Sequence, residues 1–186
     1  KLETSNPNQS SIGRSKCLQL ISTIYSRQSK HQEAIKMSRE VVRLLKNKND
    51  TSGTLGLAYT SLGILYEKER RKDSIETLFL LALKDFEAHK NVAYLPNAYL
   101  KIGKIAQQKN QKEISFSYFN KAMEISRSTE NKQGQVSCLL AIGKWYSEFD
   151  HNNTKAENLY HEANQIAQSL SDKIFEIKSL EALIEI

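Results

Sequence analysis

Apolar side chains recur along this chain at the spacing of an α-helix, in stretches separated by short polar breaks. In residues 17–25, for example, they stand at positions 17, 18, 21, 24 and 25, which share one face of a helix. Residues 1–10 lack this pattern, and we expect a flexible lead-in there. The pattern predicts an all-α chain with helices at residues 11–25, 31–46, 55–67, 74–89, 92–107, 111–127, 132–147, 154–169 and 173–186.

A five-residue segment marks a repeat within this series of helices. The sequence Leu-Gly-Ile-Leu-Tyr at residues 62–66 returns twice in altered form, so that Gly63, Gly103 and Gly143 stand 40 residues apart. A weaker, earlier copy has Ser22 in place of the glycine. A fixed period of this length is typical of helical-repeat proteins. We therefore predict an α-solenoid of about four antiparallel helix pairs with a truncated final helix, divided as 11–49, 50–90, 91–130, 131–171 and 172–186.

Residues that can cap a helix recur with the same period. Asp50, Asn91, Asn131 and Asp172 each stand before a predicted first helix, 40 or 41 residues apart. Their side-chain oxygens can accept hydrogen bonds from the N–H groups that the first turn of a helix leaves without a partner. We predict that all four are N-caps.

The residues at the repeated slots resemble those of the tetratricopeptide repeat (TPR) family. The first TPR helix has a large apolar residue, then Leu-Gly, then Tyr, which Tyr59, Leu62, Gly63 and Tyr66 match. The second has Ala, an aromatic residue and Ala, and the corresponding residues are Ile75-Phe79-Ala82, Ser115-Phe119-Ala122 and Ala156-Tyr160-Ala163. Glycine and alanine at these slots let two helices approach closely, while the aromatic rings fill the space between repeats.

The repeat differs from the usual TPR unit in its length. A standard unit has about 34 residues and a closing proline, whereas this one has 40 or 41 residues and lacks that proline. Long repeats of this kind resemble those of kinesin light chains, cell-polarity adaptors and the peptide-sensing Rap and PlcR-like regulators of bacteria. The resemblance specifies the fold more closely than the function.

The first helices of a TPR array line a concave groove, and slots counted from the glycine predict which side chains point into it. These slots hold Gln19, Thr60, Asn97, Lys104 and Lys144, and Lys101 borders them. Lys104 and Lys144 are equivalent residues of adjacent repeats, and ammonium groups spaced in this way suit an acidic segment or a C-terminal carboxylate. The alternative is that these lysines belong only to the solvated face of a helix.

One known ligand class of TPR domains does not fit these slots. Chaperone-binding TPR domains hold two carboxylates with Lys and Asn side chains from successive first helices. The first repeat here has Gln19 and Thr23 where that clamp needs Lys and Asn. We therefore do not expect recognition of a chaperone tail.

The charge of the chain permits an acidic partner. The formal net charge is +6, and the basic residues are spread along the chain, which disfavours nucleic-acid binding without excluding it. Cys17 and Cys138 hold the same repeat slot, and we interpret both as small buried hydrophobic residues in a reducing compartment. No apolar run is long enough to span a membrane, and the N-terminus does not resemble a signal peptide. We expect a cytoplasmic protein without membrane insertion.

The chain lacks the sequence motifs of an enzyme. Its four histidines form no metal-ligand motif, and there is no Gly-rich phosphate loop, nucleophile elbow or Cys–His motif. We therefore expect no catalysis, no cofactor and no metal. The predicted function is a scaffold module that holds a protein or peptide in its groove, within a larger signalling or regulatory protein. Two alternatives stay open, namely the peptide-sensing part of a bacterial transcription or phosphorelay regulator and a basic nucleic-acid-binding surface, and the oligomeric state is unknown.

Overall fold

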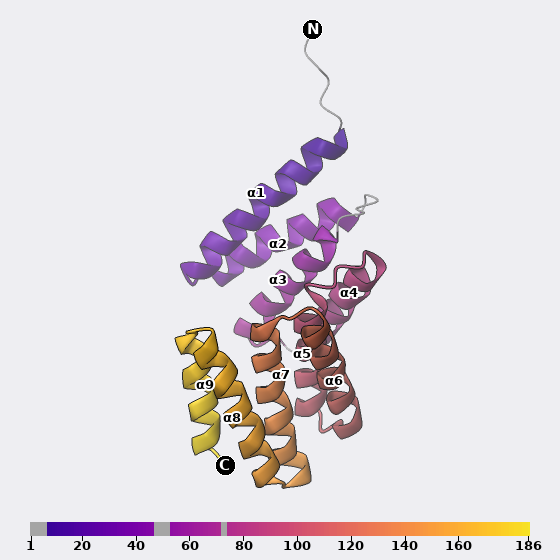
Figure 1. The fold of residues 1–186 in the computed structure, drawn as a ribbon. Helices are drawn as coiled ribbons and strands as arrows, with labels where there is room; N and C mark the ends of the chain where they lie inside the picture. Colours follow the sequence, from indigo (N-terminus) through magenta and orange to yellow (C-terminus); the bar gives the residue numbers. More distant parts are fainter. Residues whose placement is uncertain (1–6, 47–52, 72–73) are drawn as a thin grey trace. The chain divides into compact units, whose positions relative to one another are not determined.

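The computed structural model describes residues 7–46, 53–71 and 74–186, and for residues 7–12 it describes the backbone alone. Every regular element in this part of the chain is helical, which confirms the prediction of an all-α, TPR-like fold. The helices are α1 (Pro7–Arg27), α2 (His31–Lys46), α3 (Thr54–Lys68), α4 (Ile75–Ala88), α5 (Leu95–Gln108), α6 (Lys112–Ser128), α7 (Lys132–Trp145), α8 (Asn153–Ser169) and α9 (Lys173–Ile184) (Figure 1). A π-helical segment, Tyr146–Asp150, follows α7 directly.

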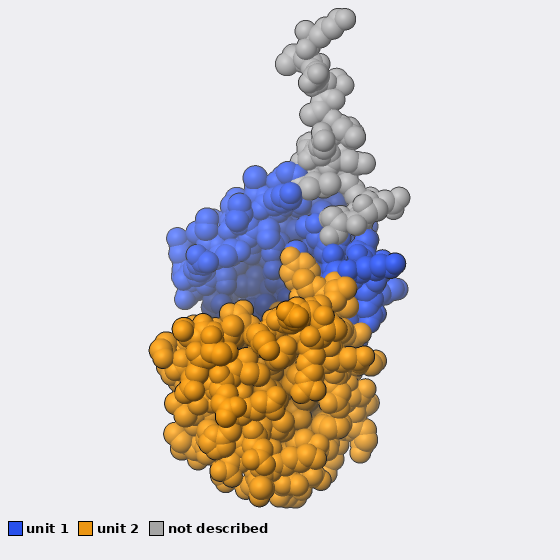
Figure 2. Space-filling view, viewed as in Figure 1, with its two compact units in different colours: residues 1–91 blue, residues 92–186 orange. Residues whose placement is uncertain are grey.

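The chain divides into two compact units, residues 1–91 and 92–186, which Figure 2 colours blue and orange. In unit 1, α1 packs on α2, α2 on α3, and α3 on α4. In unit 2, each helix from α5 to α9 packs on the next, and α7 also contacts α5 and α9. Because short turns connect them, the two helices of each pair run antiparallel.

The repeated glycines lie where the two helices of a pair cross. A Cβ atom at Gly63 would lie 2.9 Å from the Phe79 ring, and one at Gly103 would lie 2.5 Å from the Phe119 ring. A Cβ atom at Gly143 would overlap the Tyr160 ring in the same way. Phe79, Phe119 and Tyr160 are almost completely buried. The glycine is therefore required by the close approach of an aromatic ring on the second helix, as the sequence predicts.

The α1–α2 pair fills the same crossing differently. Ser22 stands in the glycine slot, and its Oγ donates a hydrogen bond to the backbone oxygen of Ala34 at 2.9 Å. Ser38 stands in the slot of the aromatic residue, and its Oγ lies 2.8 Å from the Oγ of Ser22. Both serines are buried, at 3 % and 0 % exposure. Two small polar side chains thus replace the pair of glycine and ring.

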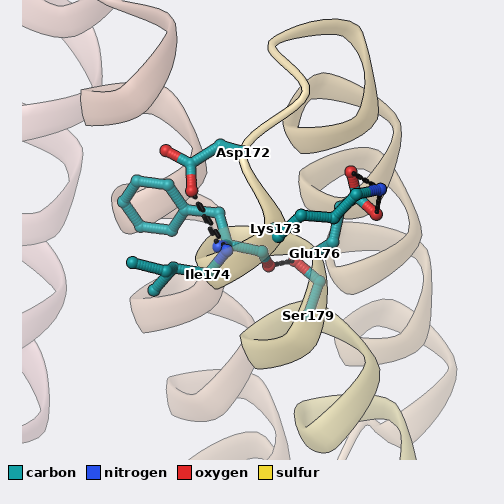
Figure 3. A network of polar contacts seen from close by, with 6 residues as sticks. Asp172, Lys173, Ile174, Glu176 and Ser179 are labelled. Atoms are coloured by element: carbon teal, nitrogen blue, oxygen red, sulfur yellow. Dashed lines mark hydrogen bonds and ion pairs between the residues drawn. The ribbon is translucent and has the colours of Figure 1, made fainter.

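Two of the four predicted N-caps are confirmed. The Oδ1 of Asn131 accepts a hydrogen bond from the N–H of Gly134 at 2.8 Å. The Oδ1 of Asp172 accepts bonds from the N–H groups of Ile174 and Phe175 at 3.2 and 3.3 Å, as Figure 3 shows. Asp50 lies outside the described residues.

The prediction for Asn91 is wrong, because α5 does not begin beside it. Residues 92–94 form a turn, and the helix starts at Leu95 with Pro96 in its first turn. Proline favours that position because it lacks the N–H that would have no partner there. Likewise α1 begins at Pro7 rather than near residue 11, so residues 7–10 of the expected lead-in are helical, and residues 1–6 lie outside the described part.

The helix ends share a second repeated device. The residue that ends the turn has a positive φ at Ser29, Arg70, Lys90, Asn110, Glu130 and Ser171, between 52° and 60°. In each case the N–H of the next residue donates a hydrogen bond to the backbone oxygen five residues before it, as in Asn131 N–H to Ser126 O at 2.8 Å. This is the Schellman arrangement, which usually has glycine at the left-handed position. Here residues with side chains occupy that position throughout.

The prediction that both cysteines are buried holds only for Cys138. Cys138 is completely buried, whereas Cys17 is exposed. The described neighbours of α7 include α6 and α8, while α1 packs principally on α2. A side chain on the opposite face of α1 therefore stays exposed, as Leu20 also does at 65 %.

Candidate functional site

A cleft of about 540 Å³ lies over the first helices of unit 2. Its lining comes mainly from α5, α7 with its π-helical extension, and α9, and Tyr160 of α8 joins it. The successive first helices are linked by side-chain hydrogen bonds between residues about one repeat apart, such as Gln133 Nε2 to Asp172 Oδ2 at 3.2 Å. The lining residues are Lys104, Gln107, Gln108, Leu140, Ala141, Lys144, Ser147, Glu148, Tyr160, Lys178, Ala182, Glu185 and Ile186.

Two of the predicted groove residues, Lys104 and Lys144, line this cleft together. Lys104 comes from α5 and Lys144 from α7, and both side chains are exposed. They line the same cleft because the 40-residue repeat places equivalent slots of neighbouring first helices side by side. That they bind a partner stays a prediction.

The cleft also contains acidic groups that slot counting does not reveal. The Oε1 of Glu148 lies 3.4 Å from the Nζ of Lys144, and the Oε2 of Glu148 accepts a hydrogen bond from Gln107 Nε2. Lys178 and Glu185 of α9 complete the charged lining. The cleft is therefore mixed in charge, with three lysines and two glutamates. The spacing of four residues between Lys144 and Glu148 is a signal in the sequence that could have indicated this pair.

Tyr160 forms a buried, polar part of the lining. Its exposure is 4 %. Burial, followed by the negative charges of Glu148 and Glu185, raises the pKa of Tyr160 to about 12. The phenol is therefore neutral at ordinary pH and keeps its O–H as a potential donor. Together with the apolar side chain of Leu140, it gives the cleft both hydrogen-bonding and apolar surface.

Cys138, close behind this surface on α7, is not a reactive group. Burial raises the pKa of its thiol to about 11, although its contact with Ser126 and the charges of Lys104 and Arg127 act in the opposite direction. A thiol with so high a pKa carries almost no thiolate at neutral pH, and the thiolate is the nucleophile. This agrees with its interpretation as a small buried hydrophobic residue.

The remaining predicted residues of unit 2 lie elsewhere. Asn97 lines a separate depression of about 300 Å³, together with Leu100, Ser137 and Phe175. Lys101 is half-buried and lies in neither lining. Asn97 is seven residues, or two turns, from Lys104, which separates the two side chains along α5.

Gln19 and Thr60 belong to unit 1, and both make hydrogen bonds there. Gln19 Nε2 donates to the Oγ of Ser61 at 2.6 Å, which links α1 to α3. Thr60 Oγ1 donates to the backbone oxygen of Gly56, one turn earlier in its own helix, at 2.9 Å. Both side chains are half-buried. The Gln19 bond thus joins two helices, and the Thr60 bond stays within α3.

The aromatic residues beside the cleft pack on one another. The rings of Phe116 and Trp145 lie 4.4 Å apart between centroids, and Trp145 Nε1 donates to the backbone oxygen of Lys112 at 3.0 Å. Tyr146 and Phe149 add edge contacts to the same indole ring. This cluster joins α6 to the end of α7, in agreement with a packing role for these rings.

Residues 96–129, which contain α5, α6 and the turn between them, match the tetratricopeptide repeat family. The chain contains a tetratricopeptide repeat. The TPR resemblance inferred from the glycine and aromatic slots is thus confirmed, and the matched segment carries the Lys104 side of the cleft. A search of curated proteins gives no match to this chain.

Solved structures with the same fold are distant in sequence. Aspartyl phosphate phosphatase F from Bacillus subtilis superposes with a TM-score of 0.80 at 14 % identity, over 92 % of this chain and 44 % of the phosphatase. BtubC (BKLC) from P. vanneervenii gives 0.74 at 18 % identity, over 89 % and 68 %. The nearly identical TPR-like repeats assigned to a kinesin light chain of Podosopora anserina give 0.66 at 12 % identity, over 90 % and 82 %. These likenesses establish the TPR-like fold, and this chain spans less than half of the phosphatase.

Two further observations bear on chemistry. None of the described helices is long and apolar enough to cross a membrane. Within the described part of the chain, no group of three His, Cys, Asp or Glu side chains is arranged to hold a metal ion. The fold is one that serves as a scaffold for binding other proteins, through the extended surfaces that stacked helices form.

Proposed function

We propose that this chain is a peptide-binding scaffold module and that the cleft over α5, α7 and α9 holds an extended segment of a protein partner. The observation that carries the proposal is that Lys104 and Lys144, from equivalent slots of adjacent repeats, line one cleft of about 540 Å³. A cleft of that size accommodates several side chains of an extended peptide.

The charges of the lining specify the segment further. Lys144 forms an ion pair with Glu148, with 3.4 Å between Nζ and Oε1. Glu185 adds a second carboxylate to the lining. A uniformly acidic segment would be repelled by these glutamates. The partner segment therefore combines a carboxylate that binds the lysines, an apolar side chain that packs on Leu140, and a basic or amide group that binds the glutamates. This refines the acidic ligand that the sequence predicts.

The test is a charge reversal in the cleft. Peptides selected from a random display library against the whole chain provide the ligand, and fluorescence anisotropy measures their affinity. Lys104→Glu with Lys144→Glu should weaken binding at least about tenfold, because each reversal replaces an attraction by a repulsion and adds to the charge of Glu148. The melting temperature should stay the same, because both lysines are exposed.

Lys121→Glu with Lys132→Glu is the matched control. It makes the same change of net charge in α6 and α7, at exposed positions outside the lining, and it should leave the affinity nearly unchanged. Equal losses in the two double variants would mean that the chain attracts peptides through its overall charge, and the cleft assignment would then be wrong.

A narrower function is peptide sensing in a bacterial regulator, because the long repeat resembles that of the Rap regulators and RapI shares the fold. In such a regulator the bound peptide must bind two arrangements of the helices with different affinity, so that it shifts their populations. Small-angle scattering with and without a selected peptide tests this. A change in the radius of gyration supports sensing, and an unchanged curve at saturation supports a static scaffold.

A further inference from the structure

A second cleft, of about 460 Å³, lies in unit 1 among α1, α2 and the turn that follows α3. Its lining is strongly basic, with five cationic side chains and one carboxylate: Arg14, Lys36, Arg39, Arg43, Arg71 and Glu40. We call this cleft the arginine pocket. The slots of the TPR pattern do not indicate it, because most of its residues come from the second helix, α2, and the others from α1 and from the turn after α3.

The single carboxylate of the arginine pocket is already engaged. Glu40 accepts hydrogen bonds from Arg43 at 2.7 and 2.8 Å, and Arg14 lies 3.5 Å from its Oε1. The hydrogen bond from Arg43, supported by the charges of Arg43 and Arg14, lowers the pKa of Glu40. Glu40 therefore neutralises part of the positive charge of Arg43 and Arg14. It forms no ion pair with the other two arginines, Arg39 and Arg71.

Arg39 and Arg71 have neutral partners and a shared support. Arg39 donates to the Oη of Tyr66 from Nε at 3.0 Å and from Nη2 at 2.6 Å. Arg71 Nη2 donates to the Oε1 of Gln32 at 3.2 Å. Both guanidinium groups lie over the ring of Tyr66, at 5.6 and 5.7 Å from its centroid. Tyr66 is only 8 % exposed, so a buried ring supports two guanidinium groups that form no ion pair with a carboxylate of the described residues. The carboxylate of Glu69 accepts a hydrogen bond from Gln32 and so lies one side chain away from Arg71.

We propose that the arginine pocket binds a phosphate group, either free or carried by an organic molecule. An arginine has five N–H donors, and Arg39 uses two of them on Tyr66. The remaining donors of Arg39, those of Arg71 and the ammonium group of Lys36 can surround the oxygens of a dianion, a geometry that suits phosphate better than a single carboxylate. Leu18 and Met37, which also line the pocket, offer apolar surface to an organic body beside the phosphate.

This site is independent of the proposed peptide cleft, since its residues all belong to unit 1. NMR titration of the whole chain with inorganic phosphate, and separately with phenyl phosphate, tests it, with the ionic strength held constant by sodium chloride. Saturable shifts at residues of α2 and at the end of α3 are expected for both ligands. Tighter binding of phenyl phosphate would assign the natural ligand to an organic phosphate, and equal affinities would assign it to the free ion.

Three variants distinguish binding at a specific site from attraction by the net charge of the chain. Arg39→Gln should weaken phosphate binding at least about tenfold. Tyr66→Phe, which removes the acceptor that orients Arg39, should weaken it several-fold although the charge is unchanged, and Arg39→Lys should not restore full affinity, because lysine lacks the planar fork. Arg27→Gln is the control, with the same loss of charge at an exposed position of α1 outside the lining.

The results that overturn the proposal are equally definite. Linear, non-saturating shifts with phosphate would show that no site exists. So would an affinity that falls as much in Arg27→Gln as in Arg39→Gln, because the ion would then be responding to the net charge of the chain. Circular dichroism of each variant confirms that the helices are intact before the affinities are compared.

Discussion

In the α1–α2 pair a serine faces a serine where the helices cross, while in the α7–α8 pair a glycine faces a tyrosine. The Oγ atoms of Ser22 and Ser38 lie 2.8 Å apart, and that of Ser22 donates a hydrogen bond to the backbone oxygen of Ala34. Gly143 leaves room for the ring of Tyr160, which a Cβ atom would overlap. The crossing therefore limits the combined size of the two facing side chains. Glycine with an aromatic ring fits this limit, and so do two small hydrogen-bonded side chains.

The two solutions differ in what they contribute to stability. Burial of an aromatic side chain is worth about 1.5–3 kcal/mol, whereas a buried hydrogen bond contributes about 0.5–1.5 kcal/mol net. The pairs with glycine and a ring should therefore hold more strongly than the serine pair. Three sets of substitutions test this difference and a fourth tests a helix end, and all can be read from the free energy of unfolding in urea.

The largest loss is expected when the ring is removed. Tyr160→Ser should lower the free energy of unfolding by about 3–5 kcal/mol, because a cavity replaces a large buried side chain. Adding Gly143→Ser to the same chain reproduces the pair of α1 and α2, and should recover part of the loss. A coupling energy of zero between the two sites would contradict the rule of combined size.

Enlarging the glycine should cost somewhat less. Gly143→Val should lower the free energy of unfolding by about 1–3 kcal/mol, because the added atoms push against Tyr160. Gly13→Ala is the matched control in α1, since a Cβ atom there meets nothing within 4 Å. The control should stabilise the chain by up to about 1 kcal/mol through its higher helix propensity. If Gly143→Val stabilised the chain as Gly13→Ala does, helix propensity would decide the outcome and the crossing would impose no limit on size.

Removing the hydroxyl of the serine pair should have a smaller effect. Ser22→Ala takes away the donor to Ala34 and the neighbour of the Ser38 hydroxyl, at a cost of about 1–2 kcal/mol. Ser137→Ala provides the comparison, because the Oγ of Ser137 bonds within its own helix to Gln133 O. Equal, small losses in both would mean that the Ser22–Ser38 contact contributes nothing specific.

The smallest change is a gain at a helix end. Glu130 has a φ of 52°, a conformation that costs a residue with a side chain about 1 kcal/mol relative to glycine. Glu130→Gly should therefore raise the free energy of unfolding by up to about 1 kcal/mol, reduced by the greater freedom of glycine in the unfolded chain. The same substitution at exposed Glu124, in the middle of α6, should lower it.

The sequence predicts those features that a short motif determines locally. Gly63, Gly103 and Gly143 indicate the helix crossings, and Asn131 and Asp172 indicate two helix starts, because each acts through its immediate surroundings. The prediction for Asn91 is wrong because α5 begins four residues later, at Leu95, with Pro96 in its first turn. The prediction for Cys17 is wrong because its exposure depends on which helices pack beside α1, and the repeat pattern does not contain that information.

The clefts depend on more distant relations. Lys104 and Lys144 can be paired from the sequence because the repeat aligns them. Glu148 stands four residues after Lys144, so the sequence can indicate this ion pair, whereas the place of Glu185 and Tyr160 in the same lining requires the structure. The arginine pocket could not be predicted for a related reason, since Arg14 lies on α1, Arg39 on α2 and Arg71 in the turn after α3, and the three share no period.

The last helix carries the rule of combined size one step further. Ile184 is 41 residues after Gly143, the same distance that separates Asp172 from Asn131, so it holds the glycine slot of α9. It is 84 % exposed, and Ile177 on the same face is 55 % exposed. A helix that lay on this face with a tyrosine or phenylalanine in the facing slot would collide with a branched side chain. The rule of combined size therefore predicts a small residue opposite Ile184 in any helix that packs closely on this face.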